Sequence, residues 1–390
     1  MIQGTLKRRN EHLIGISLLV GLLLPQTSTA LLMVNPILCL FLFFYFRKGH
    51  VETFGGKTVF ITALVLSFIA NFAFGDVSSK SVLTFLNILL ILFCFPFIGD
   101  YKIRNIYFYI ALLFILFSQF AIFMNIPLLS PLYKVLYPPS LYEGYYNYVA
   151  QNAGFHNIFN FRMSGIYHNP NQCARYVTII FAAFILENRT QKVEKCLPYI
   201  AITALSVLMT GSRTGLFVFA AILLVWLWLN DSVSKTKKNL VLLGIICFFA
   251  YMLYSSIGFR GIELREGMDN SANLKLYALL DYLKHDNGIM HLLFGNFDQE
   301  KFERSSINII GQMDSEYGYL IFNYGFVAFF AYIYFFIAVG KKLTKYNRIM
   351  LIPMLWILSS TMLLAFRPVF VFMLLLSKYF VTSTKERQLI

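Results

Sequence analysis

The chain alternates between long continuous runs of apolar residues and shorter polar segments. The runs contain 12 to 23 residues, and an α-helix needs roughly 20 to cross a bilayer, so flanking polar and aromatic residues must complete the shorter spans or the bilayer must thin locally. Barrel strands would instead alternate apolar and polar positions, which these runs do not. The pattern predicts an all-α polytopic membrane protein with about 12 transmembrane helices, forming a single integral membrane domain over residues 1–390. The predicted spans are Leu13–Leu24, Ala30–Phe46, Thr58–Phe74, Val82–Ile98, Ile106–Phe123, Cys173–Leu186, Leu197–Met209, Leu216–Leu229, Leu240–Ile257, Tyr317–Val339, Ile349–Phe366 and Val369–Phe380.

Composition supports a membrane environment. Hydrophobic residues make up 58% of the 390 residues and charged residues only 13%, and the mean hydropathy is +0.65. A soluble domain carries about 25% charged residues. So much apolar surface cannot be buried inside one globule of this size, so the bilayer must solvate it.

Basic residues are distributed unevenly between the two sides of the membrane that the spans define. The whole net charge of +14 falls on one side, and the positive-inside rule makes that side cytoplasmic. We therefore expect a bacterial inner (plasma) membrane protein with both termini in the cytoplasm. The basic balance reflects topology and contact with membrane lipids, and is not a nucleic-acid signal. The cytoplasmic cations are Lys7, Arg8, Arg9, Arg47, Lys48, Lys57, Lys102, Arg104, Arg189, Lys192, Lys195, Lys235, Lys237, Lys238, Lys341, Lys342, Lys345, Arg348, Lys378, Lys385 and Arg387.

Two long hydrophilic loops, residues 124–172 and 258–316, then fall on the periplasmic side. In the second loop, residues 273–284 place leucines on one face and predict an amphipathic helix that lies on the membrane or caps a site. No charged residue lies near the middle of a span, where coupled transporters usually keep such groups. The polar residues there are expected to hold helices together; they are Asn71, Asn87 and Gln119. The chemistry is therefore expected at the outer surface.

Arg213 is the most informative cation on the outer side. It lies in a predicted tight turn between two spans, flanked by Gly211 and Gly215. Its guanidinium has the planar fork of donors that suits phosphate oxygens, and the following helix N-terminus adds a partial positive charge. The glycines would let an anion approach the backbone. The alternative is an arginine that snorkels to a lipid phosphate.

A second group of polar residues precedes the span at Cys173. Arg162, His168 and Arg175 lie close together in the sequence at the outer edge, where the cations are candidate phosphate ligands and His168 is a candidate base or a plain surface residue. Asn169 and Asn171 surround a proline, which is a turn and cap signal.

A third group opens the span at Tyr317. Asp314 and Glu316 are either helix-capping carboxylates or a general base whose pKa rises by partial desolvation at the membrane edge. Two further outer cations, Lys275 and Arg367, are candidate phosphate contacts, and Arg367 is alternatively a hairpin anchor. No Walker loop, HExxH, GxSxG or DxD-like pair occurs, so we expect a site without metal or nucleotide cofactor.

These segments resemble the Wzy O-antigen polymerase and O-antigen ligase superfamily over roughly residues 105–340. The resemblance rests on their order, spacing and shared outer location. The matching segments are Arg162–Ala174 before one helix, Gly211–Gly215 opening another, Leu292–Gly295, Asp314–Leu320 and the pair Tyr324-Gly325.

The resemblance implies a GT-C-like fold and lipid-linked glycan chemistry at the outer face. Its members use a polyprenyl pyrophosphate, here undecaprenyl pyrophosphate, as leaving group and a saccharide hydroxyl as nucleophile. A chain-length regulator protein is the partner that the family leads us to expect. Ligases carry a histidine near the position of Asp314 to Glu316 and tend to carry an arginine where Lys275 lies, so the departures here favour a polymerase.

The resulting hypothesis is an inverting transfer of the growing glycan onto a new lipid-linked repeat unit. Arg213, assisted by Arg162 and Arg175, would stabilise the departing pyrophosphate. Glu316 or Asp314 would accept the proton of the attacking hydroxyl, with His168 as a third candidate. An O-antigen ligase, a flippase or other transporter, and a membrane scaffold stay as alternatives.

Overall fold

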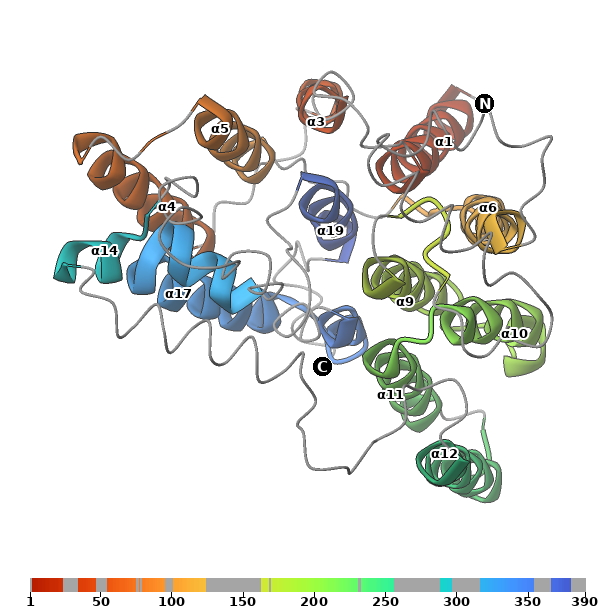
Figure 1. The fold of residues 1–390 in the computed structure, drawn as a ribbon. Helices are drawn as coiled ribbons and strands as arrows, with labels where there is room; N and C mark the ends of the chain where they lie inside the picture. Colours follow the sequence, from red (N-terminus) through yellow and green to blue (C-terminus); the bar gives the residue numbers. More distant parts are fainter. Residues whose placement is uncertain are drawn as a thin grey trace. The chain divides into compact units, whose positions relative to one another are not determined.

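The structure, a computed structural model, describes about two-thirds of the chain, and Figure 1 draws its helices. Within that part the backbone forms helices and no β-strand. This all-helical fold is consistent with a helical membrane protein. The described residues are 2–23, 34–46, 55–74, 77, 79–94, 101–123, 163–167, 170–230, 233–255, 288–296, 316–353 and 366–379.

The chain divides into two compact units, and neither is a continuous segment. Unit 1 comprises Met1–Val34, Asp100–Glu263 and Lys345–Trp356. Unit 2 comprises Asn35–Gly99, Leu264–Thr344 and Ile357–Ile390. Each unit is described by itself below.

Unit 1 is built around one buried helix. Helix α9 packs against α6, α10, α11 and η3, and α1 packs on α6 (Figure 1). Every residue of α9 from Cys173 to Leu186 is buried, including the charged Arg175. The helices of unit 1 are α1 (Ile2–Leu23), α6 (Asn105–Phe123), α9 (Pro170–Glu187), α10 (Val193–Met209), α11 (Arg213–Leu229), α12 (Lys235–Ser255) and the 3-10 helix η3 (Asn347–Leu351).

Unit 2 is organised around a long helix that carries a kink. Helix α17 packs against α4 and the short α14 (Figure 1), and α5 contacts α4 and α19. The helices of unit 2 are α3 (Val34–Tyr45), α4 (Gly55–Ala73), α5 (Ser79–Phe93), α14 (Ile289–Phe294), α17 (Glu316–Lys342) and α19 (Phe366–Tyr379).

The helices coincide with the predicted spans, although their ends differ. Every predicted run contains an α-helix except Ile349–Phe366, where η3 covers the start and residues 354–365 lie outside the described residues. In the described part, two helices are long and apolar enough to cross a membrane, at Gly55–Ala73 and Leu320–Lys342. The predicted count of about 12 spans and the loop topology stay predictions.

The polar residues in the middle of the predicted spans differ in their hydrogen bonds. Gln119 bonds to Ser206 of α10, and Asn71 bonds to the Phe294 carbonyl that ends α14, so both connect helices as predicted. The side-chain nitrogen of Asn87, which is buried, has no hydrogen-bond partner in the described structure.

One of the predicted cytoplasmic cations is buried. Lys57 is only 4% exposed, and its ammonium donates to the Phe93 carbonyl at 3.5 Å. The thiol of Cys39 donates to the carbonyls of Ile91 and Cys94 in the same turn. These groups therefore satisfy the C-terminal carbonyls of α5, where a cation also complements the helix dipole.

Candidate functional site

The turn before Arg213 has the tight form that the sequence predicts. Gly211 adopts a φ of 58°, and its N–H donates to the Leu208 carbonyl at 2.9 Å, which ends α10. Ser212 caps α11 by accepting the N–H of Gly215 at 3.1 Å. Arg213 is the first residue of α11, so its backbone lies where unsatisfied N–H groups and the helix dipole favour an anion.

Gly215 lets the start of α11 approach α9 closely. A Cβ atom built on Gly215 would lie 2.7 Å from the Cβ of Ala174 and 3.3 Å from the side chain of Ser212. Any larger residue would therefore push the two helices apart. Ala174 directly precedes Arg175, so this contact brings together the two segments for which the sequence predicts phosphate-binding arginines.

Arg175 is enclosed by protein. Its side chain is 0% exposed, and its neighbour Tyr176 stacks on Tyr167 with ring centroids 4.7 Å apart. The sequence predicts Arg175 at the outer edge of the bundle, whereas the structure places it in the core of unit 1. A guanidinium stays charged even when it is buried, so it adds a fixed positive charge to this part of α9.

The segment Met163–Tyr167, which follows Arg162, is also buried and is fixed by α6. Gln119 donates to the Met163 carbonyl at 3.2 Å and to the Ser206 carbonyl at 3.0 Å. The hydroxyl of Ser118 accepts the N–H of Ile166 at 3.2 Å. This segment and the end of α10 therefore share one anchor.

The anchor on α6 is a part of the site that sequence reasoning did not assign to it. A Cβ on Gly165, whose φ is 57°, would lie 2.5 Å from the Ser118 oxygen, so this turn requires glycine. The N–H of Met163 also donates to the carbonyl of Met209, the last residue of α10. The signal in the sequence is the amide of Gln119 in the middle of an apolar span, which predicts a link between helices but not the segment that it holds.

Some of the predicted site residues lie within the described part of the chain and others do not. Asn171 lies in the first turn of α9, because that helix begins at Pro170, three residues before the predicted span. Proline suits a first helical position, where its missing N–H costs no hydrogen bond. The predicted residues Arg162, His168, Asn169, Lys275 and Asp314, and the amphipathic helix over 273–284, lie outside the described residues.

In unit 2, Glu316 is the first residue of α17, as the sequence predicts. That helix is interrupted nine residues later at Gly325, where φ is 74° and ψ is 179°. The carbonyls freed by the kink have other partners. The Phe322 carbonyl accepts the N–H of Asn296 at 2.7 Å, and the Tyr324 carbonyl accepts the hydroxyl of Ser67 at 2.6 Å.

The kink in α17 is held by a reciprocal contact between the segments that contain Gly295 and Gly325. A Cβ on Gly325 would lie 2.2 Å from the Leu293 carbonyl oxygen, and one on Gly295 would lie 2.3 Å from the Asn323 carbonyl. Both glycines have positive φ. The two short segments that resemble the Wzy superfamily here, Leu292–Gly295 and Tyr324-Gly325, therefore pack backbone against backbone.

Arg367 lies in the first turn of α19, followed by Pro368. The sequence treats this pair as a break in the last apolar stretch. In the described part of the chain the last helix begins at Phe366, so the proline occupies a position near the helix start where it is tolerated. The backbone of Arg367 is thus placed at a helix N-terminus, as are those of Arg213 and Glu316.

Comparison with known proteins adds one finding. Residues 77–273 match the model of a protein family described as WcaD colanic acid polymerase. No curated protein and no solved structure matches the chain. The matched range covers half of the chain and includes α6, α9, α10 and α11, with the contact between Ala174 and Gly215.

Proposed function

Because the chain belongs to the WcaD colanic acid polymerase family, we propose that it joins lipid-linked oligosaccharide repeat units into a surface polysaccharide. The observation that carries the proposal is the contact of Ala174 with Gly215. It lies inside the matched range and joins the segments of Arg175 and Arg213. Two cationic segments on one helix crossing suit a substrate that carries a diphosphate.

In the proposed reaction, the growing glycan leaves its undecaprenyl pyrophosphate. A hydroxyl oxygen at the non-reducing end of a new lipid-linked repeat unit attacks the anomeric carbon and forms the new glycosidic bond. The bond between that carbon and the pyrophosphate oxygen breaks, and the electron pair leaves with the pyrophosphate. A single displacement of this kind inverts the anomeric configuration. The bond to pyrophosphate supplies the driving force, so the reaction consumes no nucleotide.

Negative charge builds up on the departing pyrophosphate, so preorganised cations lower the barrier. We assign this role to Arg213, whose backbone stands at the N-terminus of α11, with Arg162 and Arg175 assisting. Arg367 and Lys275 are additional contacts to phosphate. Gly211 and Gly215 shape the turn, and Asn169 and Asn171 shape the entry into α9.

A carboxylate takes the proton of the attacking hydroxyl. Glu316, the first residue of α17, and Asp314 share this assignment, with His168 as the remaining candidate. The reaction is placed at the periplasmic face of the inner membrane, in a twelve-span topology with both termini in the cytoplasm. A chain-length regulator is the proposed protein partner.

A deletion strain tests the proposal through its glycans. Loss of a polymerase leaves single repeat units in place of the ladder of long chains, and the plasmid-borne gene restores the ladder. Purified protein in liposomes should lengthen lipid-linked repeat units and release undecaprenyl pyrophosphate without other proteins. Polymer that accumulates on its carrier, next to bare lipid A–core, would show a ligase instead. Repeat units stranded in the inner leaflet would show a flippase.

A further inference from the structure

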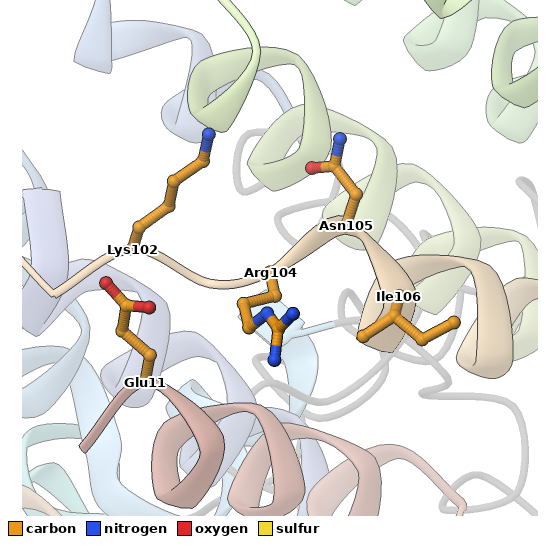
Figure 2. Close-up of a pocket in the computed structure, with 5 residues that line it drawn as sticks. All are labelled: Glu11, Lys102, Arg104, Asn105 and Ile106. Carbon is orange, nitrogen blue, oxygen red and sulfur yellow. The ribbon is translucent and has the colours of Figure 1, made fainter. Parts of the chain in front are cut away.

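A cavity of about 410 Å³ lies at the end of unit 1 where α1 and α6 meet. Its lining combines both charges. Glu11 comes from α1, Lys102 and Arg104 come from the segment that leads into α6, and Asn105 and Ile106 begin α6 (Figure 2). We infer that this cavity binds the headgroup of a zwitterionic glycerophospholipid, with its phosphate at Arg104 and the start of α6 and its ammonium at Glu11.

The wall of the cavity is held in place by hydrogen bonds. Arg104 donates from Nη1 to Nε2 of His12 at 2.9 Å. Arginine has no acceptor, so Nε2 must accept, and Nδ1 of His12 then donates to the Tyr107 hydroxyl at 2.6 Å. This chain of bonds orients one side of the guanidinium, and the other N–H groups of the fork suit a phosphate.

The start of α6 is fixed as well. The side-chain amides of Asn105 and Asn188 exchange two hydrogen bonds, at 2.9 Å and 3.0 Å, which tie α6 to the end of α9. The first backbone N–H groups of α6 add a partial positive charge next to Arg104. The phosphate side of the site is thus built on two anchored elements.

Glu11 determines which phosphate fits. A bare anion, such as inorganic phosphate or an anionic headgroup, would be repelled by the carboxylate, and such repulsion is how sites reject the wrong ligand. A headgroup that carries an ammonium beside its phosphate satisfies both charges at once. Ethanolamine phospholipids have this chemistry, and a primary ammonium can donate hydrogen bonds to a carboxylate.

An apolar stripe on α6 indicates that the ligand has acyl chains. Ile106 lines the cavity, and the exposed residues that follow it at intervals of three and four lie on the same helix face. The stripe extends from Ile106 to Phe117, 12 residues with a rise of roughly 16 Å, which is about half of the ~30 Å hydrocarbon core and so matches one leaflet. Its members and exposed fractions are Ile106 53%, Ile110 42%, Leu113 49% and Phe117 53%.

Lipid titration of the full-length protein in detergent, followed by native mass spectrometry, tests the inference. Wild-type protein should bind dioleoyl phosphatidylethanolamine about tenfold more tightly than dioleoyl phosphatidylglycerol, which corresponds to about 1.4 kcal/mol. In Glu11→Gln this ratio should fall to near one. In Glu194→Gln, the matched control at an exposed acid in the first turn of α10, the ratio should stay at the wild-type value.

Two further arms complete the test. Arg104→Gln should weaken binding of both lipids several-fold, and 10 mM inorganic phosphate should not displace the ethanolamine lipid. The inference is overturned if wild-type protein shows no preference between the lipids, if Glu11→Gln keeps the preference, or if free phosphate competes. The ratio is measured within each folded sample and needs no glycan substrate, so the outcome is independent of the proposed polymerase activity.

Discussion

Arg213 combines two sources of positive charge at one point. Its guanidinium belongs to the residue type best suited to phosphate oxygens, and its backbone begins α11 after the Ser212 cap. Gly211 ends the preceding helix with a positive φ, so only a short turn separates the two helices. The chemistry assigned to this position follows from side chain and backbone together.

We predict that Arg213→Ala lowers polymer formation by roughly 10²–10³, the usual loss when one preorganised donor to the transition state is removed. Arg213→Lys should restore little, because a point charge does not replace the fork. The length distribution of the glycan and the initial rate in liposomes measure the effect at matched protein levels. Arg189→Ala, which removes an exposed arginine from the turn after α9, is the control. Normal long chains in Arg213→Ala cells would refute the assignment.

The crossing of α9 and α11 depends on two small residues. A methyl group at Gly215 would overlap Ala174 at 2.7 Å, and overpacking of this kind typically costs about 1–3 kcal/mol. We predict that Gly215→Ala lowers the free energy of unfolding of the purified protein by that amount, measured by thermal unfolding. Adding Ala174→Gly should recover part of the loss, because it removes the facing methyl group.

The double-mutant cycle provides the control for this crossing. An interaction energy of at least about 0.5 kcal/mol is expected for residues in direct contact, and Ala174→Gly alone should cost about 1 kcal/mol through its helix propensity. If the two changes are strictly additive, the helices do not meet at these residues.

The kink in α17 sets the direction of the helical segment that starts at Glu316. Gly325→Ala would place a Cβ 2.2 Å from the Leu293 carbonyl and force a side chain into a positive φ. We predict that the free energy of unfolding falls by about 1–3 kcal/mol or more, because backbone strain of this kind alone costs that much. Thermal unfolding of purified protein, with the yield of folded protein, measures it.

Gly244→Ala is a matched control for the kink. Gly244 lies in α12, and a Cβ there would meet nothing within 4 Å. That substitution should be neutral or stabilise the protein by up to about 1 kcal/mol. Equal melting temperatures for the two variants would mean that Gly325 does not pack against α14.

For the molecule as a whole, the charge distribution predicts which side faces the cytoplasm. In a variant with its five cysteines replaced, Gly288→Cys should react with a membrane-impermeant maleimide in cells with a permeabilised outer membrane. Thr190→Cys should react only after lysis. A Cβ at Gly288 has open space around it, and Thr190 is exposed, so access to either position depends on its side of the membrane. The reverse labelling pattern would show that the predicted topology is inverted, and the proposed reaction could then not take place on the periplasmic side.

The helical fold and the tight turn before Arg213 follow from local features of the chain. Continuous apolar runs specify helices because backbone hydrogen bonds need internal partners in hydrocarbon. Gly211, Ser212 and Gly215 specify the turn through their own torsion angles and hydrogen bonds. Such information lies within a few residues, so the helix positions and the placement of Glu316 at a helix start were predictable.

Long-range packing determines the rest. The burial of Arg175 and the contact between Ala174 and Gly215 depend on how α9 sits among its neighbours. The anchor at Gln119 joins residues that are 44 and 87 positions away. The chain near Leu293 gives no local sign that its carbonyl packs against Gly325. Close backbone packing satisfies atoms far apart in the sequence, and residue type alone does not reveal which partner fills the space left by a glycine.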